Sequence, residues 1–262
     1  MIRALRSAAS GMYAQQLYID TIANNLSNVN TTGFKRAKME FQDLVYQTLR
    51  GNGNSSELGA VLPTELQVGH GVRPIAIQKS FEQGNILPTS NPLDLSIDGE
   101  GFFQVSRPDG TVQFTRDGSF KMSRDGNLVT SDGYPMEPAI TVPSDTSNVM
   151  ISRDGTVSVT LIGETEPQTI GQIELARFVN PAGLSNLGQN LYKETVSSGP
   201  PILSTPGAEG MGQVSQGFLE SSNVQIVEEM VAMIVAQRAY EVASKAIKTA
   251  EEMLQIANSL KR

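Results

Sequence analysis

Apolar residues recur at alternating steps of three and four from Ser221 to Arg262, at the end of the chain. This spacing is typical of a helix that packs along its length against another helix. Glu229 is the only residue that interrupts the apolar stripe. At the rise of an α-helix the segment would be roughly 55 Å long, longer than a small domain is wide. A helix of this length needs a partner.

Residues 1–30 repeat the same spacing, with Gln15 as the only polar residue in the stripe. Turn and cap residues replace helix formers from Asn28 to Gly33, so we expect the first helix to end near Asn28. We call the apolar positions of the two helices the seam. The seam comprises Leu5, Ala8, Met12, Ile19, Ile22, Leu26 and Val29 in the first helix and Met233, Ala236, Tyr240, Ala243, Ile247, Ala250 and Leu254 in the last.

Two interpretations of these helices stay open at this point. Either they pack with copies of themselves, or both cover the core of one globular domain, as most apolar stripes do. The first interpretation is favoured because the spacing is strictly heptad over several turns. The middle of the chain also offers no other helical pattern on which they could pack.

The middle of the chain is predicted to be β-structure, from Leu66 to about Glu220. Asp-Gly pairs recur there between short alternating runs, and such a pair predicts a hairpin because glycine accepts the positive φ of a tight turn. The aspartates could instead bind calcium, but none has the spacing of a calcium-binding loop. The pairs are Asp98-Gly99, Asp109-Gly110, Asp117-Gly118, Asp125-Gly126, Asp132-Gly133 and Asp154-Gly155.

We therefore expect an α+β fold in which the two terminal helices form a coiled-coil domain around a central all-β domain rich in hairpins. The expected boundaries are residues 1–30 for the first helix, 31–71 for an extended or linker segment with a flexible loop over 50–62, 72–221 for the β domain and 222–262 for the last helix. Residues 33–49 mix apolar and charged side chains, which fits either a short helix or an extended arm.

The composition excludes several classes of function. With a net charge of -7 and a pI of about 4.9, the chain has no electrostatic support for binding nucleic acid. It contains no cysteine, which excludes disulfides, thiolate catalysis and thiolate metal sites. No apolar run is long enough to span a membrane. The first residues lack the continuous apolar core of a secretory signal, so we interpret them as part of the mature structure rather than as a cleavable signal peptide.

Candidate catalytic residues are scarce. The only histidine, His70, lies between glycines without a nucleophile-elbow pattern, so we interpret it as a turn residue. Gly51-x-Gly53 and Gly99-x-Gly101 lack the third glycine and the following helix of a phosphate-binding loop. We therefore expect no enzyme activity, no cofactor and no metal site. A secreted β-domain enzyme or binding module remains the alternative to a structural, self-assembling protein.

Two terminal motifs resemble those of the bacterial flagellar rod and hook proteins. One ends the first helix and the other lies in the last helix. The total length and the runs Gly101 to Val105 and Thr115 to Phe120 are most similar to the distal rod members of this family, and a proximal rod subunit is the alternative within it. The motif residues are Ala23, Asn24, Asn25, Leu26, Asn28, Thr31, Gly33, Phe34 and Lys35, followed by Gln237, Arg238, Ala239 and Tyr240.

The resemblance implies a structural subunit of the flagellar basal body that spans the periplasm. It implies helical self-assembly into a rigid hollow drive shaft, which transmits torque to the hook and conducts exported subunits. The implied partners are copies of the chain, proximal rod and hook subunits, the rings of the outer membrane and peptidoglycan, and the flagellar export apparatus. The seam would hold the inner layer of the tube, and the β domain would form its outer wall.

Residues 50–62 are polar, glycine-rich and without periodicity, which is typical of a flexible loop. A loop of this length inside a compact domain is uncommon. The resemblance places it where distal rod proteins carry an insertion that hook subunits generally lack. Our hypothesis is that the loop orders only in the polymer and stiffens the tube by reaching a neighbouring subunit through Leu58, Val61 and Leu62.

Overall fold

The computed structural model describes residues 2–50, 65–163 and 166–259, and it has an α+β fold, as the sequence predicts. The chain divides into two compact units. The first, which we call the helical unit, combines Met1–Leu26, Ala37–Gln78 and Gln225–Arg262. The second, the β unit, combines Ser27–Arg36 with Lys79–Val224. Each unit is therefore built from segments that are far apart in the sequence.

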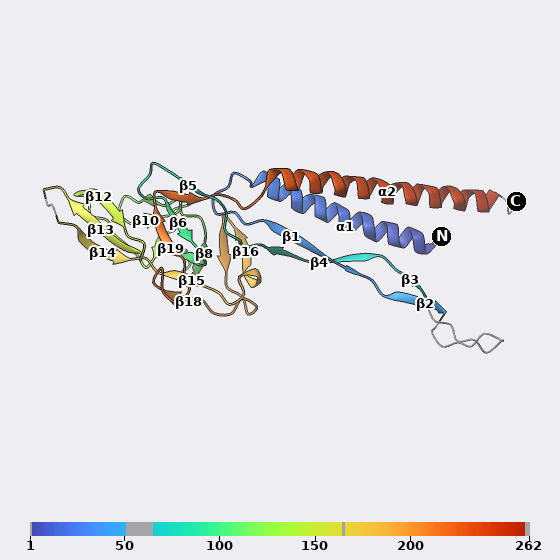
Figure 1. Cartoon of the computed structure of the whole chain (residues 1–262), viewed down its shortest axis with the longest axis horizontal. Coiled ribbons are helices and arrows are strands. Elements are labelled where there is room, and N and C mark those ends of the chain that lie inside the picture. The colour runs from blue at the N-terminus through green and yellow to red at the C-terminus, as the bar shows by residue number, and fades with distance from the viewer. Residues whose placement is uncertain (1, 51–64, 164–165, 260–262) are drawn as a thin grey trace. The chain divides into compact units, whose positions relative to one another are not determined.

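The helical unit contains the two long helices, α1 (Ile2–Ser27) and α2 (Ile226–Ser259), which run in opposite directions (Figure 1). α1 ends beside Asn28, as expected. Between the helices in sequence come β1 (Ala37–Asp43), β2 (Tyr46–Arg50), β3 (Leu66–Gly69) and β4 (Val72–Lys79). β1 pairs with β4 and β2 with β3, so these strands form a two-stranded ribbon. The segment that fitted either a helix or an extended arm is thus mainly strand.

The β unit is organised around a seven-stranded sheet with the strand order β16-β17-β8-β7-β15-β18, to which β11 adds by pairing with β7. A three-stranded sheet, β12-β13-β14, and the pairs β10–β9, β19–β6 and β20–β5 complete it. The described elements are β5 (Ile86–Pro88), β6 (Leu95–Asp98), β7 (Phe102–Ser106), β8 (Val112–Thr115), β9 (Lys121–Met122), β10 (Leu128–Val129), β11 (Met136–Glu137), β12 (Thr146–Ile151), β13 (Thr156–Leu161), β14 (Gln168–Gln172), β15 (Leu175–Arg177), the short 3₁₀ helix η1 (Pro181–Gly183), β16 (Ser185–Gly188), β17 (Leu191–Lys193), β18 (Ile202–Ser204), β19 (Gln213–Gln216) and β20 (Phe218–Glu220).

The Asp-Gly pairs differ in what they do. Those ending in Gly110, Gly126 and Gly155 connect paired strands, and each glycine has the positive φ that the hairpin prediction requires. Asp98-Gly99 links β6 and β7, which pair with other strands. Gly118 has no positive φ, and glycine is needed there because a Cβ atom would lie 1.6 Å from the carbonyl oxygen of Leu95. The Asp117-Gly118 pair therefore needs its glycine for space, and not for the positive φ that the hairpin prediction assumed.

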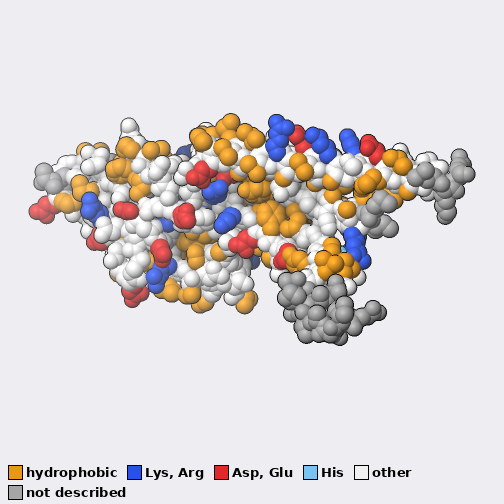
Figure 2. Space-filling model, turned by 45° about the vertical axis from the view of Figure 1, so that its right-hand side comes forward, with side chains coloured by type: hydrophobic (Ala, Val, Ile, Leu, Met, Phe, Trp, Pro, Cys, Tyr) orange, Lys and Arg blue, Asp and Glu red, His pale blue; other side chains and the backbone are white. Residues whose placement is uncertain are grey.

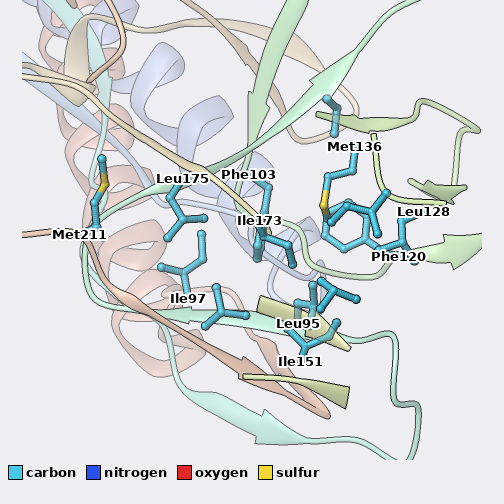
Figure 3. Close-up of a cluster of buried hydrophobic side chains, with 14 of the residues drawn as sticks. Leu95, Ile97, Phe103, Phe120, Leu128, Met136, Ile151, Ile173, Leu175 and Met211 are labelled. Carbon is cyan, nitrogen blue, oxygen red and sulfur yellow. The ribbon is translucent and has the colours of Figure 1, made fainter. Parts of the chain in front are cut away.

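Side chains of β7 contribute to two hydrophobic cores, because alternate residues of a strand point to opposite faces. Phe103 and Val105 belong to the larger core, which Figure 3 shows and in which the ring centroids of Phe103 and Phe120 are 5.2 Å apart. Phe102 lies in the smaller core with Phe114 and Phe178. The central strand is therefore covered on both faces over this stretch.

α2 begins four residues after the expected start of the last helix at residue 222. The helix begins at Ile226, and the Ser222 hydroxyl accepts a hydrogen bond from the Val224 N–H at 3.3 Å. The residue between them, Asn223, donates to the carbonyl oxygens of Ser80 and Glu82. Tertiary contacts of this segment thus delay the helix beyond the local signal. None of the described helices is long and apolar enough to cross a membrane.

Candidate assembly surface

The predicted seam corresponds to the less exposed side of both helices. In α1, Ile22 is buried, and the other seam positions up to Leu26 are partly buried. In α2, Ala236 and Ala250 are buried, whereas Tyr240 remains 40% exposed. The remaining seam positions of α2, all partly buried, are Met233, Ala243, Ile247 and Leu254. Val29 lies in the turn after α1 and is also partly buried.

The opposite side of α2 is also apolar near its beginning, and it is exposed. Val227 is 74% exposed, Val231 is 55% exposed and Val235 is 61% exposed. We call the exposed residues Val227, Met230, Val231, Ile234 and Val235 the outer face of α2. Figure 2 shows hydrophobic side chains gathered on the surface over the helices. A helix that is apolar on all sides is normally buried, so this face of the single chain lacks the cover that its composition calls for.

Asn25 joins three elements of the helical unit. Its Oδ1 accepts a hydrogen bond from the Ala37 N–H, and its Nδ2 donates to the Ala37 carbonyl oxygen, both at 2.9 Å. Nδ2 also donates to Oε2 of Glu229 at 3.2 Å, and both side chains are 1% exposed. The end of α1, the start of β1 and the start of α2 thereby meet at one buried amide. This contact explains why Glu229 interrupts the apolar seam: its carboxylate has a partner there.

The part of the N-terminal motif that follows Leu26 belongs to the β unit. Gly33 has a φ of +66°, and a Cβ atom there would lie 2.6 Å from the backbone nitrogen of Asp117. Thr32 donates a hydrogen bond to the Asp117 carboxylate at 2.9 Å. The Lys79 ammonium lies 3.9 Å from the centre of the Phe34 ring, and burial lowers the pKa of Lys79 to about 8. Residue 33 lies so close to the backbone of Asp117 that only glycine fits there.

Lys35 is fully buried and forms the centre of a charged cluster. Its ammonium donates to Oε1 of Glu220 at 2.5 Å and to the Glu82 carbonyl oxygen at 2.7 Å. Arg116, 4% exposed, lies 3.7 Å from Oε2 of Glu220 and donates to the Gly99 carbonyl oxygen at 2.6 Å. Burial lowers the pKa of Lys35 despite the opposing effect of Glu220, and burial likewise lowers the pKa of Arg116. The Glu220 carboxylate is therefore the counter-charge of two buried cations, Lys35 and Arg116.

The remaining motif residues are partly buried or exposed. The Asn28 carboxamide accepts a hydrogen bond from the Thr31 hydroxyl at 3.2 Å, which supports the turn after α1. Arg238 forms an exposed ion pair with Glu241 at 2.9 Å. Ala23 is partly buried, Asn24 and Gln237 are exposed, and Ala239 is partly buried. The loop residues Leu58, Val61 and Leu62 lie outside the described residues.

Sequence patterns did not single out Arg116, Glu220 or Glu229 as partners of the motif residues. Arg116 lies in a run that carries the family resemblance, whereas Glu220 ends the predicted β region without any local signal. Of these three residues, only Glu229 was noticeable in the sequence pattern, as the residue that interrupts the seam. Within the described part of the chain no three His, Asp or Glu side chains are grouped so that they could hold a metal ion.

Three family models match the chain, and together they describe flagellar rod and hook proteins. They are the flagella basal body rod protein model over residues 5–35, the flagellar hook protein FlgE/F/G D1 domain over 96–159 and the C-terminal model of the flagellar basal body rod FlgEFG proteins over 215–260. The matched segments contain both terminal motifs and the central strand β7.

Curated relatives show to which family of flagellar rod and hook proteins the chain is most similar. The flagellar basal-body rod protein FlgG of Borreliella burgdorferi is 54% identical over 100% of both chains. FlgG of Buchnera aphidicola from Schizaphis graminum is 50% identical over 99% of this chain and 100% of its own, and FlgG of Caulobacter vibrioides is 47% identical over 99% and 100%. The chain belongs to the FlgG family of distal rod proteins and is a structural subunit of the flagellar basal-body rod. The resemblance found in the sequence is thereby confirmed.

Proposed function

We propose that this chain assembles helically with copies of itself, through coiled-coil packing of α1 and α2, into the rigid hollow shaft of the distal rod. The observation that carries the proposal is the apolar outer face of α2, which the single chain leaves exposed opposite a seam that is already partly buried. Burying apolar surface drives association, at roughly 25 cal/mol per Å². An exposed patch of this kind on a soluble chain is typical of an interaction site.

The seam and the outer face have separate roles in this proposal. The seam residues of α1 and α2 pack the two helices of one subunit, and the outer face packs against helices of neighbouring subunits. A contact between two different surfaces propagates from copy to copy, and it generates an open helix when the rotation between copies does not close a ring. The tube connects proximal rod and hook subunits, transmits torque and conducts exported proteins, while the β units form the wall that faces the peptidoglycan and outer-membrane rings. It spans the periplasm, and its subunits leave through the flagellar export apparatus.

A charge placed on the outer face tests the proposal. Val235→Glu should leave the single chain folded, because the side chain is 61% exposed, but should prevent assembly, since a buried unpaired carboxylate is strongly unfavourable. Val196→Glu is the matched control, because Val196 is 104% exposed in the β unit. Far-UV circular dichroism reports folding, and electron microscopy of rods with motility reports assembly.

We expect folded chains from both variants but rods only from Val196→Glu. Straight rods and normal motility from Val235→Glu would contradict the proposed role of the outer face. Loss of rods from both variants would show that any added surface charge interferes, which also removes support for a dedicated helical contact.

A further inference from the structure

A groove in the β unit lies on the face of the seven-stranded sheet that also carries Phe102. Its volume is about 540 Å³. Gln104 and Glu137 are directly opposite each other in the β7–β11 pairing, so their side chains share one face of the sheet. Gln104 follows Phe102 by two residues, which places it on the face of the smaller core. The groove is therefore an extension of that core face beyond its aromatic cover.

The groove combines acidic side chains with apolar walls. Glu137 and Glu174 are both partly buried, and neither has an ion pair or hydrogen bond of its side chain among the described residues. Pro135, Pro138 and Leu203 line the groove beside them. Two half-desolvated carboxylates without a counter-charge favour a cationic ligand, since the low dielectric strengthens the attraction. The apolar walls suit the methylene stem of a lysine or arginine side chain.

A second observation points to a ligand that carries a hydrogen-bond donor. The side chain of Gln104 is 5% exposed and lines the groove, yet no described residue forms a hydrogen bond with its carboxamide. Its amide atoms are not among the fully enclosed polar atoms that lack a partner, so they are open to the groove and accessible to a ligand. Its Oε1 can accept a hydrogen bond from a guanidinium or ammonium group that enters the groove.

The same chain presents a basic tip that complements the groove. The β9–β10 hairpin exposes Lys121 and Arg124, and no described residue forms an ion pair with either side chain. Met122 between them is 55% exposed and adds an apolar surface. An acidic groove and a basic tip on one chain are different surfaces, so their contact would propagate from copy to copy as a rod requires.

We propose that this groove docks the β9–β10 hairpin of a second copy of the chain, with Glu137 and Glu174 binding Lys121 and Arg124. The inference extends the proposed function by giving the outer wall of the rod its own contact between subunits. This contact requires no change in the packing of α1 and α2. Complementary charges at such a contact also exclude wrong docking geometries, because like charges would then oppose each other.

Zero-length carbodiimide crosslinking of concentrated wild-type protein tests the contact without requiring a polymer. Mixing isotopically labelled and unlabelled copies distinguishes crosslinks between copies from those within one. We expect amide bonds between Lys121 of one copy and Glu137 or Glu174 of another. Their absence from concentrated protein would overturn the inference, whether or not rods form, so this result is separable from a failure of the proposed function.

A charge swap provides the second test. Glu137→Arg and Arg124→Glu should each raise the protein concentration needed for assembly by about tenfold or more, since a like-charge contact replaces an attractive one. The double variant should restore assembly to within about threefold of wild type, because the pair is rebuilt with reversed signs. Glu194→Arg, an exposed site of the β unit outside the groove, is the control and should behave as wild type. Additive defects in the double variant, or unaffected single variants, would overturn the inference.

Discussion

At the scale of single residues, three members of the N-terminal motif are explained by contacts with residues farther along the chain. Asn25 uses its carboxamide on Ala37 and Glu229, Gly33 lies against the backbone of Asp117, and Lys35 is neutralised by Glu220. Each contact needs that residue type: an amide that donates and accepts, a residue without Cβ, and a long cation. The motif therefore specifies how the segment after α1 is held.

Removing the single carboxylate from the charged cluster should destabilise the β unit. Glu220→Gln leaves Lys35 and Arg116 buried without a counter-charge, and we expect a loss of about 3 kcal/mol or more in the free energy of unfolding. Glu194→Gln, at an exposed site of the same unit, should change it by less than about 0.5 kcal/mol. Urea unfolding followed by far-UV circular dichroism measures both. Equal stability of the two variants would show that the cluster contributes nothing.

A methyl group at Gly33 should be costly for two reasons. The positive φ strains any other residue, and the new Cβ would clash with the backbone of Asp117 at 2.6 Å. We expect Gly33→Ala to lower the free energy of unfolding by about 2 kcal/mol or more. Gly133 has a φ of +86°, but nothing lies within 4 Å of an added Cβ atom. Gly133→Ala should therefore lower the free energy of unfolding only by the backbone strain, about 1 kcal/mol. If both variants lost the same amount in urea titrations, the close approach at Gly33 would be unimportant.

At the scale of elements, periodicity predicted the helices well and the strands coarsely. Helix spacing is visible in the sequence because one side of each helix is apolar over its whole length. β1 and β2 were not predicted as strands, since exposed apolar residues such as Phe41 and Tyr46 obscure the alternation there. The start of the last helix was expected at residue 222, four residues before Ile226, because the contacts of Asn223 with Ser80 and Glu82 are not visible in the local pattern.

The second half of α2 should differ from the β core in hydrogen exchange. Ala250 is the only fully buried residue of α2 after Val242 among those that the structure describes, whereas Phe102 to Val105 of β7 are all buried. Helical amides without tertiary cover open readily. In dilute protein we expect faster exchange over residues 243–259 than in β7, and slow exchange in both after assembly. Equal protection of the two segments in a verified monomer would contradict this expectation.

At the scale of the whole molecule, the family and the α+β architecture could be predicted from the sequence, but the residues that hold each unit together could not. The helices and the terminal motifs are local patterns, and the family models cover them. The partners Glu220 and Arg116 are distant in sequence from Lys35, and a single sequence carries no signal for such pairs. The groove beside Gln104 likewise arises only when β7, β11 and β18 come together.

The absence of cysteine makes a direct test of the central claim possible, because an engineered thiol is the only one in the chain. Val235→Cys places it on the outer face of α2, and Val196→Cys places it in the β unit. Both should react rapidly with a maleimide in dilute protein. In purified rods the account predicts that Val235→Cys becomes at least about tenfold slower, since labelling then requires local opening, while Val196→Cys remains reactive. Equally fast labelling of Val235→Cys in rods and in dilute protein would show that the outer face stays uncovered, and would contradict assembly through α2.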